Sequence, residues 1–305
     1  MNIRRAFLAV ALLLLACGSN VYAQDQPAPN SAGAPPKMLL LVHQEIQFGK
    51  AGERRKLEVA SARAYDRLKV PLSWIDLESL TGPPQALFFD PIDSYQVLDN
   101  DFAVFGQLFS AHPEVAHYQE QIEALLVNET TEIAVRRDDL GYRAQNIDLS
   151  KARFLRVLEV RVHPGFESEF VEDFQILASA YEKINADTPW VVYQVNAGSP
   201  TPAFLAFVPM SALKQNDDLL NWRKSIRDAE GEDAATRREQ IAKEAYERME
   251  SNVFVISPEM SHVSSDFAEG DPDFWAPKAS AVPKPVPHKD SSKDTGKDAD
   301  TKPAQ

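Results

Sequence analysis

Residues 154–170 read FLRVLEVRVHPGFESEF, and this stretch decides the architecture of the chain. Apolar and charged side chains alternate from Phe154 to Val162, which predicts a β-strand, and Pro164-Gly165 ends that strand. Apolar residues then recur every three or four positions from Phe166 to Tyr181, which predicts a helix with one apolar face. The segment is therefore a strand that runs through a tight turn into an amphipathic helix.

The same pattern occurs a second time, about 115 residues earlier in the chain. Residues 39–48 have a strand pattern, Gly52 follows, and a helical pattern reaches Tyr65. Further matches keep their order along the chain, namely Trp74 with Trp190, Gly82 with Gly198 and Pro91 with Pro209. We infer that the chain contains two copies of one unit.

Each copy reads as strand, helix, strand, strand, helices and strand. In the first copy we expect strands near 39–48, 73–78, 86–89 and 131–136, with helices near 53–69 and 93–127. In the second copy the last helix is predicted over 233–249 and the last strand over 252–256. The predicted fold class is α+β, with two tandem ferredoxin-like βαββαβ repeats, residues 38–142 and 153–265, forming a pseudo-dimeric α/β barrel within one chain.

The motif from Val160 through Pro164-Gly165 to Phe170 resembles the dimeric α/β-barrel superfamily, especially its NIPSNAP-like and antibiotic-biosynthesis monooxygenase-like branch. Gly52 followed by Leu57 is a degenerate copy of it. The resemblance implies two sheets packed face to face and a cavity between sheet and helices. It also implies a haem alternative, because a histidine binds haem in the distantly related chlorite dismutase-like barrels.

The N-terminal residues predict export from the cytoplasm. Arg4-Arg5, an apolar run over 6–16 and Val21-Tyr22-Ala23 together predict a signal peptide over residues 1–23. Two forms of processing stay open, because cleavage can follow Ala23 or Cys17 can be acylated in a lipobox-like sequence. The expected location is the periplasm or the cell envelope, with a lipid anchor in the second case.

The remaining segments outside the two repeats have little to bury. Residues 24–37 are rich in Pro and Ala and predict an extended linker. Residues 266–305 are rich in Pro, Lys, Asp and Ser and predict a disordered tail. No segment is long and apolar enough to predict a transmembrane helix.

Composition excludes several classes of function. The net charge of -13 argues against nucleic acid as a partner, because such binding relies on clustered Lys and Arg. A single Cys excludes a disulfide framework. The six His residues show none of the spacings of a metal site, so no metal is predicted, and no motif of a catalytic nucleophile occurs. The aspartates Asp90, Asp93, Asp99 and Asp101 are interpreted as turn and cap residues.

Strand alternation separates the side chains that face the helices from those that face the other sheet. The second face carries charged groups, which are costly between packed sheets unless they are paired or line a polar cavity. The alternatives for these groups are a structural ion pair, a hydrogen-bonding strand end and, for the tryptophans, core packing. The candidate ligand-binding residues are His43, Glu45, Trp74, Glu159, Arg161, His163 and Trp190.

Three functions remain open at this point. The main hypothesis is a non-enzymatic exported domain that binds a small apolar or aromatic ligand or an envelope protein, without a cofactor and as a monomer or homodimer. The first alternative is a cofactor-independent monooxygenase or a haem-binding oxygenase. The second alternative is a structural module whose cavity is filled by side chains.

Overall fold

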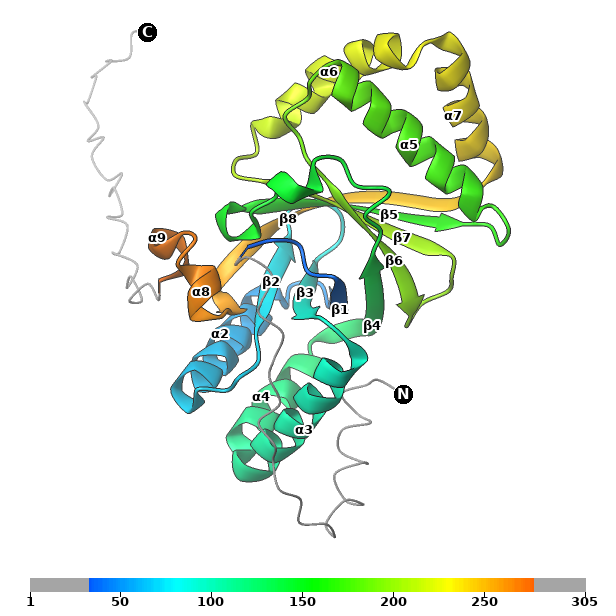
Figure 1. Ribbon diagram of the computed structural model, residues 1–305. Coiled ribbons are helices and arrows are strands. Elements are labelled where there is room, and N and C mark those ends of the chain that lie inside the picture. Colours follow the sequence, from blue (N-terminus) through cyan, green and yellow to red (C-terminus); the bar gives the residue numbers. More distant parts are fainter. Residues whose placement is uncertain (1–32, 277–305) are drawn as a thin grey trace, which may run out of the picture.

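The computed structural model describes residues 33–276, which form one closed eight-stranded barrel with helices outside it (Figure 1). The strand order is β1-β3-β2-β8-β5-β7-β6-β4, and all neighbouring strands are antiparallel. The predicted mixed α/β architecture with a barrel inside a single chain is therefore confirmed.

The first half of the barrel contains four strands and three helices. They are β1 (Met38–Ile46), α2 (Ala51–Leu68), β2 (Trp74–Ser79), β3 (Gln85–Ile92), α3 (Tyr95–Ala111), α4 (Pro113–Glu123) and β4 (Leu126–Arg136). Two short 3-10 turns, η1 (Ala144–Asn146) and η2 (Leu149–Lys151), lead into the second half. The helices α2, α3 and α4 lie on one outer side of the barrel (Figure 1).

The second half has the same order of strands and helices. It consists of β5 (Phe154–Val162), α5 (Glu167–Lys183), β6 (Val191–Ala197), β7 (Ala203–Met210), α6 (Gln215–Glu230), α7 (Glu232–Glu244) and β8 (Tyr246–His262). Strand β8 pairs with β2, and strand β4 pairs with β6, so that these two seams close the barrel. Two further short helices follow, α8 (Ser265–Ala268) and α9 (Pro272–Trp275).

Side chains along each strand point alternately into the barrel and out toward the helices, as the period of two residues requires, so the core consists of separate inner and outer clusters. Leu39, Leu41, Leu155 and Val157 belong to the apolar cluster inside the barrel. Their sequence neighbours point outward, and Val160 packs with Phe170 and Phe174 of α5 in a separate cluster. The barrel thus has an apolar interior and a helix layer on each side.

The region 93–127, where helices are expected, contains α3 and α4, and Pro113 begins α4 directly after the end of α3 at Ala111. One predicted element boundary is wrong. The helix expected over 233–249 ends at Glu244, and residues from Tyr246 onward pair with β5. The Arg and Glu spacing there is that of a strand face, since Arg248 Nε donates to Glu250 Oε1 at 2.8 Å.

The glycine that turns the chain into α2 also differs from the one expected. Gly49 has a φ of 79°, like Gly165 before α5 with a φ of 91°, and only glycine adopts this backbone at little cost. Gly52 lies inside α2 instead. The counterpart of Gly165 in the first half is therefore Gly49.

The described part of the chain extends beyond the predicted repeats at both ends. Residues 33–37 contact the barrel, where the Tyr193 hydroxyl donates to the Pro36 carbonyl at 2.7 Å. Residues 266–276, expected to be disordered, include α9, whose Trp275 is buried and donates to the Ser150 carbonyl at 2.8 Å. The predicted signal peptide, Cys17 and the rest of the linker and tail lie outside the described residues. Within the described part, no helix is long and apolar enough to cross a membrane.

Candidate functional site

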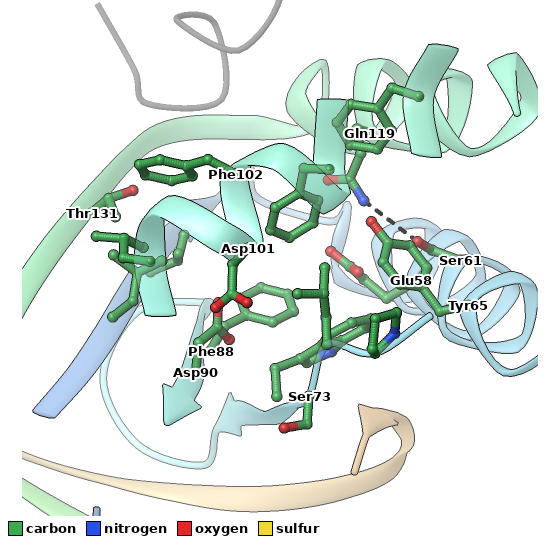
Figure 2. A pocket seen from close by; sticks show the side chains of 18 of the residues that line it. Glu58, Ser61, Tyr65, Ser73, Phe88, Asp90, Asp101, Phe102, Gln119 and Thr131 are labelled. Carbon is green, nitrogen blue, oxygen red and sulfur yellow. Dashed lines mark hydrogen bonds between the residues drawn. The ribbon is translucent and has the colours of Figure 1, made fainter. Parts of the chain in front are cut away.

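A cavity of about 440 Å³ lies between the outer face of the first-half sheet and the helices α2, α3 and α4 (Figure 2). This volume falls within the range of small-molecule sites. Leu40 and Val42 of β1 and Phe88 of β3 form its floor, and Phe102 and Phe105 of α3 form one wall. The site is therefore an apolar and aromatic chamber.

Helices α2 and α3 each present several side chains to the cavity through helical spacing. Glu58, Ser61 and Tyr65 recur at intervals of three and four on α2, which places them on one face. Helix α3 begins at the Ser94 cap, whose hydroxyl accepts from the Val97 amide at 3.4 Å. Asp101 of α3 lines the same cavity, together with the apolar residues Phe102 and Phe105 of that helix.

Asp101 is a carboxyl of the cavity whose proton affinity is changed. Burial among apolar side chains raises the pKa of Asp101 from 3.8 to about 6. Asp101 of α3 and Glu58 of α2 line the same cavity and are both labelled in Figure 2. A carboxylate with a pKa near the working pH is suited to accept a proton from a bound ligand.

A buried charged cluster extends behind Glu58. Arg54 and Asp76 are fully buried and Glu58 is nearly so. The Arg54 guanidinium lies 3.1 Å from Asp76 Oδ2 and 3.4 Å from Glu58 Oε1, and its Nε donates to Gln44 Oε1 at 2.9 Å. The Gln44 amide in turn donates to Glu129 at 2.9 Å. Burial, followed by repulsion from Glu58 and Glu78, raises the pKa of Asp76, and Arg54 opposes this.

Trp74 forms the boundary between this cavity and a second one inside the barrel. The second cavity has a volume of about 590 Å³ and shares Ser73, Trp74 and Pro91 with the first. The indole Nε1 of Trp74 donates to the Met260 carbonyl at 2.9 Å, and its ring meets Tyr65 edge-on at 4.9 Å. Trp74 is the predicted candidate residue that the structure places at both cavities.

Trp190, its predicted counterpart, has a packing role. It is buried, its Nε1 donates to the Leu140 carbonyl at 2.9 Å, and its ring meets Tyr181 edge-on at 4.8 Å. Each tryptophan therefore contacts a tyrosine edge-on, but Trp190 lines neither of the two cavities.

Three other predicted residues meet inside the barrel, away from both cavities. Glu159 and Arg161 form a pair at 3.8 Å, which corresponds to the structural ion-pair alternative. His43 hydrogen bonds to Gln85 through Nε2. Burial raises the pKa of the neighbouring Glu132, and Glu159 adds to this, while His43 and Arg161 counteract it.

Glu45 and His163 complete the predicted set, and both are exposed. The ring of His163 lies 6.5 Å from that of Phe166, just beyond the end of β5. Of the predicted candidates, Trp74 therefore lines these two cavities, and the other six do not.

Sequence reasoning missed the acidic residues of the cavity. Asp101 was interpreted as a turn or cap residue, but Ser94 caps α3 and Asp101 lies in the second turn of that helix. The sequence signal that could have identified Asp101 is that Ser94, and not Asp101, is placed to cap this helix. Arg54 and Glu58 offered only an i,i+4 charge pair, which is the ordinary pattern of an exposed helix face.

No family model matches this sequence, and no curated protein matches it either. Solved structures with a similar fold include an anthrone oxidase-like protein, with 11% identity, a TM-score of 0.49 and coverage of 74% of this chain and 93% of that one. A monooxygenase-like protein from Lactobacillus acidophilus has 6% identity, a TM-score of 0.42 and coverage of 72% and 94%.

A chlorite dismutase from Candidatus Nitrospira defluvii, solved with imidazole, has 8% identity, a TM-score of 0.43 and coverage of 73% and 91%. These neighbours are members of the dimeric α/β-barrel superfamily. At such identities the likeness concerns the fold, and the activities in those names belong to those proteins.

Two expectations are corrected at this point. The main hypothesis of a non-enzymatic binding or envelope domain is wrong, because the similar structures are oxidase-like, monooxygenase-like and chlorite dismutase proteins. The expectation of no cofactor is also wrong as stated. The similar structures include a chlorite dismutase, and haem is the alternative cofactor that the resemblance to chlorite dismutase-like barrels implies.

The residues of the two cavities do not fit haem. Proteins hold haem iron through His, Cys, Met or Tyr. Among the described residues, neither cavity lining contains a His, Cys or Met. The Tyr193 hydroxyl is already bonded to Pro36, and Tyr65 packs its ring against Trp74. Over residues 33–276, no group of three His, Cys, Asp or Glu side chains is placed to hold a metal ion.

Proposed function

We propose that the chain is a monooxygenase-type enzyme that oxidises a planar aromatic substrate in the cavity between α2, α3 and the sheet. The observation that carries this proposal is a single one. An aromatic-lined cavity of about 440 Å³ contains Asp101, a carboxyl whose pKa is raised to about 6. Aromatic walls select a flat apolar ligand, and the carboxylate supplies a base.

The proposed reaction begins with a proton transfer. Asp101 in its ionised form takes a proton from an activated methylene of the substrate, and the electron pair of that C–H bond stays on the substrate. The carbanion carbon forms a bond to one oxygen atom of O₂, which gives a hydroperoxide. The O–O bond and the second C–H bond then break, the electron pair of that C–H bond forms the C=O bond, and its proton leaves with the outer oxygen atom as water. The balanced change is R₂CH₂ + O₂ → R₂C=O + H₂O, so the substrate itself supplies the electrons, and the proton on Asp101 returns to the departing oxygen.

The apolar walls have a second effect on this chemistry. Phe88, Phe102 and Phe105 keep water away from the carbanion, which would otherwise recover a proton from solvent. They also explain the raised pKa of Asp101, because the same surroundings that favour the ligand disfavour the carboxylate charge. Binding and basicity therefore arise from one set of side chains.

We also propose a tandem origin for the two halves, a relationship to the NIPSNAP-like branch, and export to the periplasm or envelope. The repeated element order and the paired Tyr65–Trp74 and Tyr181–Trp190 contacts support the tandem origin. The predicted signal peptide supports export, with cleavage after Ala23 or acylation of Cys17 as the two routes.

Oxygen consumption tests the proposed activity directly. The purified chain is mixed with an anthrone or a naphthoquinol in an oxygen electrode, and we expect uptake above the spontaneous rate, with a loss of about a hundredfold in Asp101→Asn. Asp99→Asn, at an exposed position of the same helix, is the matched control. Absence of uptake with both probes, or equal rates in Asp101→Asn, would reject the proposal. A haem titration that yields a shifted Soret band and haem-dependent uptake would reject it as well.

A further inference from the structure

The cluster of Arg54, Glu58 and Asp76 stands where the other half of the barrel has apolar side chains. Tyr65 and Tyr181 each meet a tryptophan edge-on, which aligns α2 with α5. Counting back from these tyrosines, Arg54 corresponds to Phe170 and Glu58 to Phe174. Counting two residues on from each tryptophan, Asp76 corresponds to Val192.

The apolar set in the second half shows that the fold does not require charge at these positions. Phe170 is fully buried and stacks on Phe204 with ring centroids 3.9 Å apart, and Phe174 and Val192 belong to the same cluster. Buried ion clusters add little stability compared with well-packed apolar residues of similar volume. The charges of the first half therefore call for an explanation other than folding.

Charge balance within the cluster supplies that explanation. With both carboxyls ionised, Glu58 and Asp76 outnumber Arg54 and leave a net negative charge at positions that are 0 to 3% exposed. One proton shared between the carboxyls makes the group neutral, which burial strongly favours. Arg54 Nη1 and Asp76 Oδ1 are buried without a hydrogen-bond partner, so the polar network is not saturated by the fold.

The groups that face Asp76 come from several elements. Arg54 and Glu58 approach from α2, and Glu78 follows on the same strand and is paired with Arg55. On β8 the Ser261 hydroxyl accepts from the Asp76 amide at 2.9 Å, and it donates in turn to the Ser257 carbonyl at 2.6 Å. Arg54 thus contacts both carboxyls of the cluster.

We propose that Arg54, Glu58 and Asp76 form a proton-holding cluster behind the cavity, in which the two carboxyls share one proton and Glu58 exchanges it with the bound ligand. Glu58 is the member that lines the cavity, whereas Asp76 and Arg54 act through it as positioning residues. This deepens the proposed function, on which it rests for its use in catalysis. It implies a ligand with an ionisable hydroxyl, such as a phenol or an enol, that gives or takes that proton.

Infrared spectroscopy tests the cluster without any need for turnover. The C=O stretch of a neutral carboxylic acid is recorded in the Asp101→Asn background, so that Asp101 does not contribute. We expect such a band at neutral pH, its loss in Glu58→Gln and in Asp76→Asn, and its retention in Glu53→Gln, an exposed residue of α2. Absence of the band in the parent, or its survival in both cluster variants, would overturn the proposal.

A triple variant that copies the second half separates a proton role from a folding role. Arg54→Phe with Glu58→Phe and Asp76→Val is expected to keep the barrel, seen by circular dichroism, with an unfolding midpoint no lower than that of the parent. Unfolding of this variant together with both single variants would show that the charges hold the fold, and would overturn the proposal. If the triple variant alone fails to fold, the infrared result of the single variants decides.

The two proposals fail in different ways. Oxygen uptake without the infrared band would reject the proton-holding cluster and leave the monooxygenase-type activity. The band without uptake would reject that activity and leave the cluster. Where both are present, Glu58→Gln is expected to lower uptake about a hundredfold with a hydroxyl-bearing probe. Unchanged uptake with that probe would exclude Glu58 as the exchanging group.

Discussion

Replacement of Asp101 by Asn is expected to stabilise the protein at neutral pH while it removes the proposed base. The pKa of Asp101 is raised from 3.8 to about 6, so the folded state binds this proton more tightly than the unfolded state. The stability that comes with the bound proton is present at low pH and is lost as the pH rises from 3.8 through about 6. Asn carries no charge, so the variant does not suffer this loss.

The magnitude follows from the size of the change in pKa. Each unit corresponds to about 1.36 kcal/mol, which gives about 3 kcal/mol as an upper bound for Asp101. The side chain is only partly buried, and solvent screening reduces the effect to about 1 kcal/mol. We therefore expect Asp101→Asn to unfold at a higher denaturant concentration at neutral pH, and at the same concentration as the parent near pH 4.

Denaturant titrations over a series of pH values provide the assay. The parent is expected to lose stability relative to Asp101→Asn between about pH 4 and about pH 7, whereas the exposed control Asp99→Asn follows the parent. Oxygen uptake by the parent is expected to rise over the same interval, because the base must be ionised to accept a proton. Parallel stability curves for the parent and Asp101→Asn, or a less stable variant at neutral pH, would refute the reasoning.

Three further changes test the packing around the barrel. Trp74→Ala removes the hydrogen bond to Met260 and the wall between the cavities, and is expected to cost about 3 kcal/mol in denaturant unfolding and to admit larger aromatic probes. Asp173→Ala removes the buried carboxylate 2.6 Å from Arg238, at an expected cost of about 3 kcal/mol, whereas Glu172→Ala at the exposed pair with Arg237 costs less than about 1 kcal/mol. Gly198→Ala places a Cβ 2.0 Å from the Thr131 carbonyl oxygen, with a φ of 110°, and is expected to lower the unfolding midpoint more than Gly231→Ala, where no atom lies within 4 Å.

Several features of this protein followed from local sequence alone. Alternation over Phe154–Val162 and the turn at Gly165 were sufficient to predict a strand that leads into a helix, because these patterns depend on periodicity and backbone freedom. The same alternation placed Leu39, Leu41, Leu155 and Val157 inside the barrel. The repeated order of strands and helices then indicated a barrel within one chain.

The candidate site could not be predicted from local sequence patterns, for a physical reason. The cavity is bounded by side chains of β1, α2, β3, α3 and α4, which meet only after the helices have packed on the sheet. Burial, which turns Asp101 from an ordinary helix residue into a carboxyl with a raised pKa, depends on those neighbours and not on its own sequence context.

The two halves of the barrel also differ in a way that local sequence patterns did not predict. Local patterns predicted α2 and α5 alike, because both have helical periodicity and follow a strand and a glycine turn. Only the tertiary structure showed that Arg54 and Glu58 are buried beside a cavity whereas Phe170 and Phe174 are packed against the sheet. Periodicity determines which elements form, but the surroundings of each side chain, and with them its chemistry, are decided by how those elements pack.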